Sequence, residues 1–190
     1  MRVGVLALQG DFREHIAALD AIGVEAIPVK TSTEIDAIDA LILPGGESTT
    51  IAKLARTFGV FDQIRERIAS GMPTYGSCAG LILLADRILD GIEGQETFGG
   101  LDITARRNAF GRQVDSFEGE IQFAGIGKLN GIFIRAPWVE SVGEKVEVLA
   151  ISHGHPVAVR QGKILATSFH PELSEDFSVH RFFMSEICGA

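Results

Sequence analysis

A cysteine stands in the middle of a glycine-rich turn, between a predicted strand and a predicted helix. Residues 75–80 read Y-G-S-C-A-G. In a G-x-nucleophile-x-G turn, small neighbours allow the central residue to adopt a strained conformation at the end of a sheet. A helix N-terminus favours the thiolate form of Cys78, and the N–H of Ala79 faces an oxyanion that forms beside the sulfur. A buried cysteine that only packs in such a turn is the alternative.

His170 is the candidate base for Cys78, and Glu172 is the candidate group that orients it. The H-P-E sequence follows the apolar stretch Ile164–Ser168, where a strand leaves a sheet. Residues two apart in extended backbone point the same way, and Pro171 stiffens the link. Glu172 then orients the imidazole while His170 takes a proton from the thiol. A strand-end loop with a surface carboxylate is the alternative.

The P-G-G-E-S motif at residues 44–48 follows another apolar strand. Its two glycines allow a peptide N–H to point into a cleft and to form the second half of an oxyanion hole. Glu47 offers a carboxylate to a substrate ammonium, and Ser48 is a candidate N-cap for the next helix. When the motif is considered alone, an ordinary turn with a Ser N-cap is the better explanation, and the functional interpretation gains weight beside the Cys78 turn.

Several arginines suit a small carboxylate ligand or a protein partner. Three of them cluster in one segment and a fourth follows the strand G-I-F-I: Arg106, Arg107, Arg112 and Arg135. Solvated surface arginines are the alternative.

The remaining histidines and the second cysteine have weaker contexts. His153 and His155 flank a glycine, but no Cys or other His lies nearby to complete a metal site, so we expect a turn and no metal. His15 and His180 lie on predicted helices and are interpreted as surface residues. Cys188 is close to the chain end, where packing is expected rather than catalysis.

Composition limits the classes of protein to which the chain can belong. The 190 residues carry 17 basic and 25 acidic side chains, a formal charge of −8, and 46% of them are hydrophobic. The length and apolar content predict one domain, residues 1–190, with a sizeable core. The negative charge argues against binding nucleic acid or an anionic membrane. Two distant cysteines exclude a disulfide framework of the small secreted type, and we expect a cytoplasmic protein.

One uncharged stretch, Ile68–Ala85, just reaches the length of a membrane span. Pro73 and several glycines interrupt it, so it is predicted to form a buried strand, a turn and the start of a buried helix.

Strands and helices alternate along the first half of the chain, which predicts a parallel sheet with helices on both faces. The predicted strands are 2–8, 25–29, 40–43 and 72–75, and the predicted helices are 12–22, 48–55 and 60–69. The second half contains short alternating runs with Gly, Pro and Asn between them, which indicate hairpins or an antiparallel extension. These runs are 120–123, 131–134, 146–151, 156–159 and 164–168, before a last helix at 177–187.

The motifs, in this order, resemble a class I glutamine amidotransferase domain over essentially the whole chain. Longer segments are similar to the glutaminase subunits of pyridoxal 5′-phosphate synthases: L-x-L-Q-G-D-x-x-E-H, L-P-G-G-E-S-T-T, C-A-G-L-I-L, R-N-A-F-G-R-Q-V-D-S-F, F-I-R-A-P and S-F-H-P-E-L. The wider class usually has Gln four residues after the cysteine. Ile82 stands there in this chain, which agrees with the vitamin B6 branch.

The resemblance implies a three-layer flavodoxin-like fold and a role for each matching residue. Cys78 is implied as the nucleophile that attacks L-glutamine, His170 as the base and acid, and Glu172 as its orienting partner. Gly46 and Ala79 are implied as the oxyanion donors. The implied glutamine-binding residues are Gly46, Glu47, Ser48, Arg107, Ile134 and Arg135. Gln9 lies in a segment that the family places near the active site and the synthase interface.

The resemblance also implies a partner. Ammonia released from glutamine passes to a barrel-shaped synthase subunit in a large complex of equal subunit numbers, and the chain itself needs no cofactor. Family members are weak glutaminases alone and are activated by docking. Two other functions stay open: a Cys-His hydrolase or glutaminase that serves a different partner, and a non-catalytic flavodoxin-like binding module.

Overall fold

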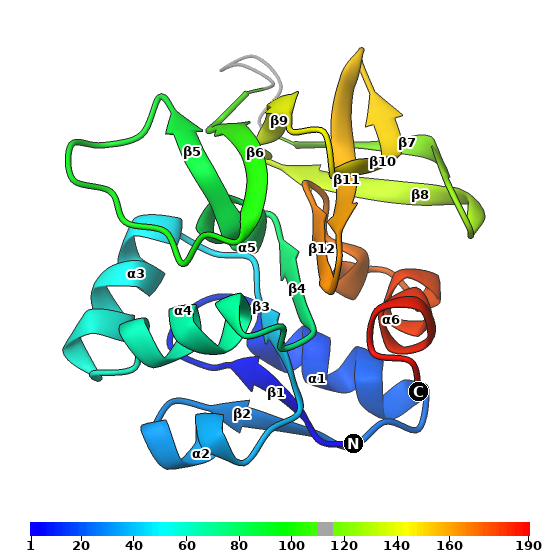
Figure 1. Ribbon diagram of the computed structural model, residues 1–190. Coiled ribbons are helices and arrows are strands. Elements are labelled where there is room, and N and C mark those ends of the chain that lie inside the picture. Colours follow the sequence, from blue (N-terminus) through cyan, green and yellow to red (C-terminus); the bar gives the residue numbers. More distant parts are fainter. Residues whose placement is uncertain (110–115) are drawn as a thin grey trace.

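The computed structural model describes residues 1–109 and 116–190 (Figure 1). The central strands are β1 (Val3–Leu6), β2 (Ala26–Val29), β3 (Ala40–Leu43), β4 (Thr74–Ser77), β10 (Glu147–Ser152), β11 (His155–Gln161) and β12 (Ile164–Thr167). They form a seven-stranded sheet in the order β10-β11-β12-β4-β3-β1-β2. Strands β12, β4, β3, β1 and β2 pair in parallel, whereas β10 and β11 add an antiparallel edge. The predicted mostly parallel sheet with an antiparallel extension is confirmed.

Helices cover both faces of this sheet (Figure 1). One face carries α1 (Phe12–Ala21) and α6 (Ser178–Phe182), which lie side by side and pack on a shared apolar cluster. The other face carries α3 (Ser48–Thr57), α4 (Phe61–Ala69) and α5 (Ala79–Leu84), with a separate cluster. Strands β1, β3, β4 and β12 are buried along their whole length, as expected for parallel strands between two helical layers.

Two smaller sheets lie at the end of the molecule where the central parallel strands finish (Figure 1). One contains β5 (Ala85–Leu89), β6 (Leu101–Arg106) and β9 (Trp138–Val142). The other is the hairpin of β7 (Ser116–Phe123) and β8 (Gly127–Ile134). The β7–β8 hairpin corresponds to the predicted runs 120–123 and 131–134, whereas the β5-β6-β9 sheet, in which β5 and β6 pair in parallel, was not predicted.

Among the helices and strands, the sequence patterns did not predict α2 (Ser32–Asp36), β5, β6 and β9. Helix α2 has five residues, too few to show a helical period, and is held by a capping box between Thr31 and Glu34. Strands β5 and β9 are mostly exposed, so neither has the apolar run of a buried strand.

Several predicted boundaries differ from the structure, and two of the differences are informative. Strand β4 continues to Ser77 because Gly76 and Ser77 still pair with β12, although their small side chains suggested the turn. The last helix changes after Phe182 into a π-helical turn, Phe183–Ile187.

The uncharged stretch Ile68–Ala85 is divided between the end of α4, strand β4 and helix α5, as predicted. Within residues 1–109 and 116–190, no helix is long and apolar enough to cross a membrane.

Candidate active site

The candidate residues follow the carboxyl ends of neighbouring parallel strands. Gln9 follows β1, the 44–48 turn follows β3, Cys78 follows β4, and His170 comes three residues after β12. These strands are adjacent in the sheet, so their ends meet at one edge, where α/β proteins bind ligands. The topology therefore brings together Gln9 and His170, which are 161 residues apart in the sequence.

Cys78 has the strained backbone that the glycine-rich turn predicted. Its φ of 49° and ψ of −99° are unusual for a residue with a side chain. The turn is anchored by the N–H of Cys78, which donates to the carbonyl of Thr167 at 2.8 Å. Gly76 and Gly80 approach each other so closely that a Cβ on Gly76 would lie 2.5 Å from the carbonyl carbon of Gly80. The small residues are thus required by packing within the turn.

His170 and Glu172 form a close, buried pair. Nδ1 of His170 lies 2.7 Å from Oε1 of Glu172, and both side chains are almost completely buried. Glu172 belongs to a 3₁₀ turn, Pro171–Leu173, and the N–H of His170 donates to the carbonyl of Ile132 on β8 at 2.8 Å. Glu172 therefore fixes the orientation of the imidazole, and its carboxylate requires the proton on Nδ1.

The environment of His170 favours its charged form. Burial alone would lower its pKa, but the hydrogen bonds to Cys78 and Glu172 and the charges of both groups raise the pKa to about 10. For Glu172, burial raises the pKa and the contacts with His170 oppose that rise. The site is thus arranged to hold a proton on the imidazole beside Cys78.

The 44–48 turn packs directly against this pair. A Cβ on Gly45 would lie 2.8 Å from Nδ1 of His170, and a Cβ on Gly46, whose φ is +149°, would lie 2.6 Å from Oε1 of Gln9. The carbonyl of Gly45 accepts from the N–H of Asp11 at 3.1 Å. Because a trans peptide directs its N–H opposite to its carbonyl, the N–H of Gly46 points away from Asp11.

Gln9 holds the other end of this turn. Its Oε1 accepts from the N–H of Glu47 at 2.9 Å. The predicted position of Gln9 near the site is thus matched by a direct contact with the turn.

A small cleft of about 80 Å³ lies over Cys78. Its lining contains every residue proposed for the oxyanion hole and for glutamine binding: Gly46, Glu47, Ser48, Ala79, Arg107, Ile134 and Arg135. Ile82, Asn108 and Pro137 also line it. Sγ of Cys78 lies 3.9 Å from the carbonyl oxygen of Ile134. The cleft therefore connects the ends of β3, β4, β6 and β8.

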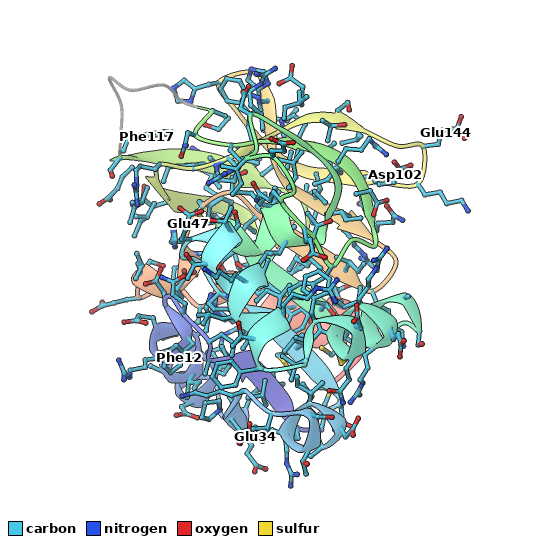
Figure 2. All side chains as sticks on the ribbon, turned by 90° about the vertical axis from the view of Figure 1, so that its left-hand side faces the viewer. Phe12, Glu34, Glu47, Asp102, Phe117 and Glu144 are labelled. Atoms are coloured by element: carbon cyan, nitrogen blue, oxygen red, sulfur yellow. The ribbon has the colours of Figure 1, made fainter. Side chains whose placement is uncertain are left out.

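Polar contacts join Glu47 to the far side of the cleft. Oε1 of Glu47 accepts from Arg107 at 2.9 Å, and the same guanidinium donates to Oε1 of Gln95 at 3.0 Å. The Gln95 amide donates in turn to Oγ of Ser48 at 3.0 Å. Figure 2 shows Glu47 at the start of α3, beneath the strands of the second half. Gln95 had no signal in the sequence, since it lies in a polar loop.

The structure changes two details of the sequence interpretation: the N-cap of α3 and the role of the arginine cluster. The N-cap of α3 is Glu47 and not Ser48, because the Glu47 carboxylate accepts from the N–H of Thr49. Arg106 binds Asp90 and Glu140 and does not line the cleft, whereas Arg112 lies outside the described residues.

Asp11, His170 and Glu172 offer three ligand atoms within 4.8 Å of one another, which is a possible geometry for a metal ion. Two of these atoms already form the 2.7 Å contact between Nδ1 of His170 and Oε1 of Glu172. That distance is typical of a charge-assisted hydrogen bond, so the residues fit an oriented imidazole. His153 and Gly154 form the expected turn between β10 and β11.

The interpretation of His15 and His180 as surface residues is wrong. Both side chains are fully buried. His15 comes three residues after Phe12 and four before Leu19, so it shares the apolar face of α1; His180 precedes Phe183 by three residues in the same way. This spacing was visible in the sequence and would have placed both rings inside.

Comparison with known proteins agrees with this arrangement. Residues 5–189 match the SNO glutamine amidotransferase family. The chain is 61% identical to pyridoxal 5′-phosphate synthase subunit PdxT of Nocardioides sp., over 96% of this chain and 94% of that protein. It is 58% identical to the protein of the same name from Mycolicibacterium vanbaalenii, over 98% and 97%. A crystal structure described as a glutamine amidotransferase superposes with a TM-score of 0.93 at 52% identity and covers 99% of both chains. This chain therefore belongs to the SNO glutamine amidotransferase family.

Proposed function

We propose that residues 1–190 form one glutaminase domain in which Cys78 is the nucleophile, His170 the general base and acid, and Glu172 its orienting partner. The observation that carries the proposal is the 2.7 Å contact between Nδ1 of His170 and Oε1 of Glu172, beside a cysteine with strained backbone. The contact leaves Nε2 of His170 for the thiol and for the leaving group. Family membership supports glutamine as the substrate.

The reaction is a thioester cycle. The sulfur of Cys78 attacks the side-chain amide carbon of L-glutamine, and His170 protonates the nitrogen as the C–N bond breaks and ammonia leaves. Water, deprotonated by His170, then attacks the thioester and releases L-glutamate. The N–H groups of Gly46 and Ala79, which line the same cleft, stabilise the oxyanion in both steps.

The mouth of the cleft binds the amino-acid end of glutamine. Its volume of about 80 Å³ suits the amide group, so the α-amino and α-carboxylate groups lie farther out. Glu47 and Arg107 are held there by their mutual ion pair, and the substrate ammonium and carboxylate complement these two charges. Ser48, Ile134 and Arg135 complete the proposed binding surface.

The ammonia is used by a partner. The relatives named above are called subunits of pyridoxal 5′-phosphate synthase. By analogy, this chain supplies ammonia to a barrel-shaped synthase subunit in a large complex with equal subunit numbers, and Gln9 lies at the interface. Both cysteines are free thiols in the structure, which suits the cytoplasm as the site of the reaction.

The test measures glutamate release by the wild type, Cys78→Ala and Cys188→Ala, each alone and with the synthase subunit of the same organism. We expect low wild-type activity that rises when the synthase is added. Cys78→Ala should lose about three orders of magnitude or more, as is usual when a catalytic nucleophile is removed. Cys188→Ala is the matched control and should behave as the wild type.

Glutamate release that survives in Cys78→Ala would overturn the assignment of the nucleophile. A wild-type chain that is fully active alone and unaffected by the synthase would overturn the proposed partner. That second result would favour a Cys-His hydrolase serving another protein.

A further inference from the structure

Two buried histidines lie behind the proposed catalytic pair and take no part in the reaction described above. His15 on α1 and His180 on α6 are fully buried, and Nδ1 of His15 lies 3.0 Å from Nε2 of His180. The ring of Tyr75 makes T-shaped contacts with both imidazoles, with centroids 5.8 Å and 6.1 Å away. The two imidazoles are thus held firmly beneath the end of β4.

This histidine pair continues to Glu172. Nε2 of His15 lies 2.9 Å from Oγ of Ser77 and 3.5 Å from Oε2 of Glu172. Oγ of Ser77 in turn donates to Oε1 of Glu172 at 3.4 Å. Oε1 of Glu172 therefore faces both His170 and Ser77, whereas Oε2 faces His15.

The chemistry of these contacts determines which nitrogen of His15 carries the proton. The carboxylate faces Nε2, so a lone pair on that nitrogen would be repelled and an N–H is attracted. With the proton on Nε2, Nδ1 of His15 accepts from the Nε2–H of His180. The hydrogen bonds then all run in one direction: His180 donates to His15, His15 donates to Ser77, and Ser77 donates to Glu172.

We propose that His15 is a positioning residue for Glu172: its Nε2–H keeps the buried carboxylate ionised and aligned with His170, while His180 fixes the tautomer of His15. The inference rests on the proposed role of the pair formed by His170 and Glu172. Without the N–H of His15 facing Oε2, Glu172 more readily takes up a proton there, and a protonated Glu172 holds the Nδ1–H of His170 less well.

The electrostatic surroundings agree with neutral rings. Burial lowers the pKa of His15 well below its usual value and that of His180 to about 4. The other titratable groups that face Glu172 are His170, the half-buried Asp11 and, through His170, Cys78. Tyr75 also senses the charge of Glu172, and its pKa is raised well above the usual value, chiefly by burial.

The first test compares His15→Leu with His15→Gln in the complex with the synthase. Leucine removes the donor, whereas Nε2 of glutamine is the same number of bonds from Cβ as Nε2 of histidine and retains an N–H there. For His15→Leu we expect the acidic limb of the profile of kcat/KM against pH to move to higher pH. At mildly acidic pH this variant should lose about tenfold or more, the effect of one hydrogen bond to a charged group.

His15→Gln should restore the wild-type limb, and His153→Gln on the exposed turn between β10 and β11 is the matched control. A merely structural role would lower activity by the same factor at every pH. Such a parallel loss in both His15 variants, or a wild-type profile in His15→Leu, would overturn the proposal.

The second test needs no activity and no variant. The side-chain ¹⁵N shifts of the wild-type chain should show His15 protonated at Nε2 and unprotonated at Nδ1 throughout the neutral range. A proton on Nδ1 would overturn the proposal even in an active complex. A wild-type complex without glutaminase activity that shows the expected tautomer would instead refute the proposed function, so the two failures are distinguishable.

Discussion

The α-carbon of Gly80, in the first turn of α5, faces the carbonyl oxygen of Leu43 at the end of β3. A Cβ on Gly80 would lie far inside contact distance of that oxygen. Because Leu43 is followed directly by the P-G-G turn and Gly80 follows the cysteine turn, this contact sets the spacing of the two halves of the site. The close approach is between two backbones, so no flexible side chain can move to relieve a clash.

Gly80→Ala should therefore destabilise the protein and separate the two turns. We expect the free energy of unfolding to fall by about 1–3 kcal/mol, the usual cost of overpacking a core. Urea unfolding at constant pH measures the change. The matched control is Gly119→Ala on β7, where a Cβ would only touch the ring of Phe117 at 3.9 Å. Equal stability of Gly80→Ala and the wild type would contradict the argument.

The two cysteines should differ in their reaction with a glutamine-like diazo-ketone. Cys78 lies beside His170, whose pKa is raised to about 10, so a positive charge is available to a thiolate there. Burial instead raises the pKa of Cys188 to about 11, which keeps that thiol protonated. Mass spectrometry should find one label per chain, on Cys78. Labelling of Cys188, or of both residues equally, would refute the assignment.

The strand-to-helix turns were predictable because each carries its own local signal. Glycines around Cys78 indicated the turn after β4, and the apolar runs before it and before the P-G-G segment indicated parallel strands. The proximity of Cys78 and His170 was not predictable in the same way, because residues 164–168 were grouped with the hairpin or antiparallel runs. In the structure β12 pairs with β4 in parallel, so the carboxyl ends of these two strands meet and bring the two residues together.

Contacts between distant side chains had no such local signal. The bridge from Glu47 through Arg107 to Gln95 depends on how the loop after β5 folds over α3, and the sequence of that loop is polar and irregular. The burial of His15 could have been derived from its place on the apolar face of α1. Its contact with Glu172 could not, because it depends on the packing of α1 against the 3₁₀ turn Pro171–Leu173.

Arg107 should contribute mainly to the binding of glutamine. Its side chain is only 13% exposed and holds Glu47 at 2.9 Å at the mouth of the cleft. For Arg107→Met we expect KM for glutamine to rise about tenfold or more, with a smaller change in kcat, since a charge-assisted contact is lost at the binding end. The adjacent Arg106→Met is the control, because Arg106 pairs with Asp90 and Glu140 away from the cleft. Equal effects of both substitutions on KM would contradict the prediction.

The burial of His180 should make the protein less stable in mild acid. Burial lowers its pKa from 6.5 to about 4 in the folded chain. Between these two pH values the unfolded chain binds a proton that the folded chain does not, so stability is complete above pH 6.5 and falls as the pH approaches 4. The contribution of His180 to this loss is about 3 kcal/mol.

In His180→Leu this contribution is absent, so the free energy of unfolding should fall less steeply over the same range, even if the variant is less stable near neutral pH. Urea unfolding at a series of pH values gives the two slopes. His153→Leu is the matched control, because His153 is exposed in the turn between β10 and β11, and it should keep the wild-type slope. Parallel curves for His180→Leu and the wild type would mean that His180 takes up its proton as readily in the folded chain as in the unfolded one, and the pair formed with His15 would then carry a charge in mild acid.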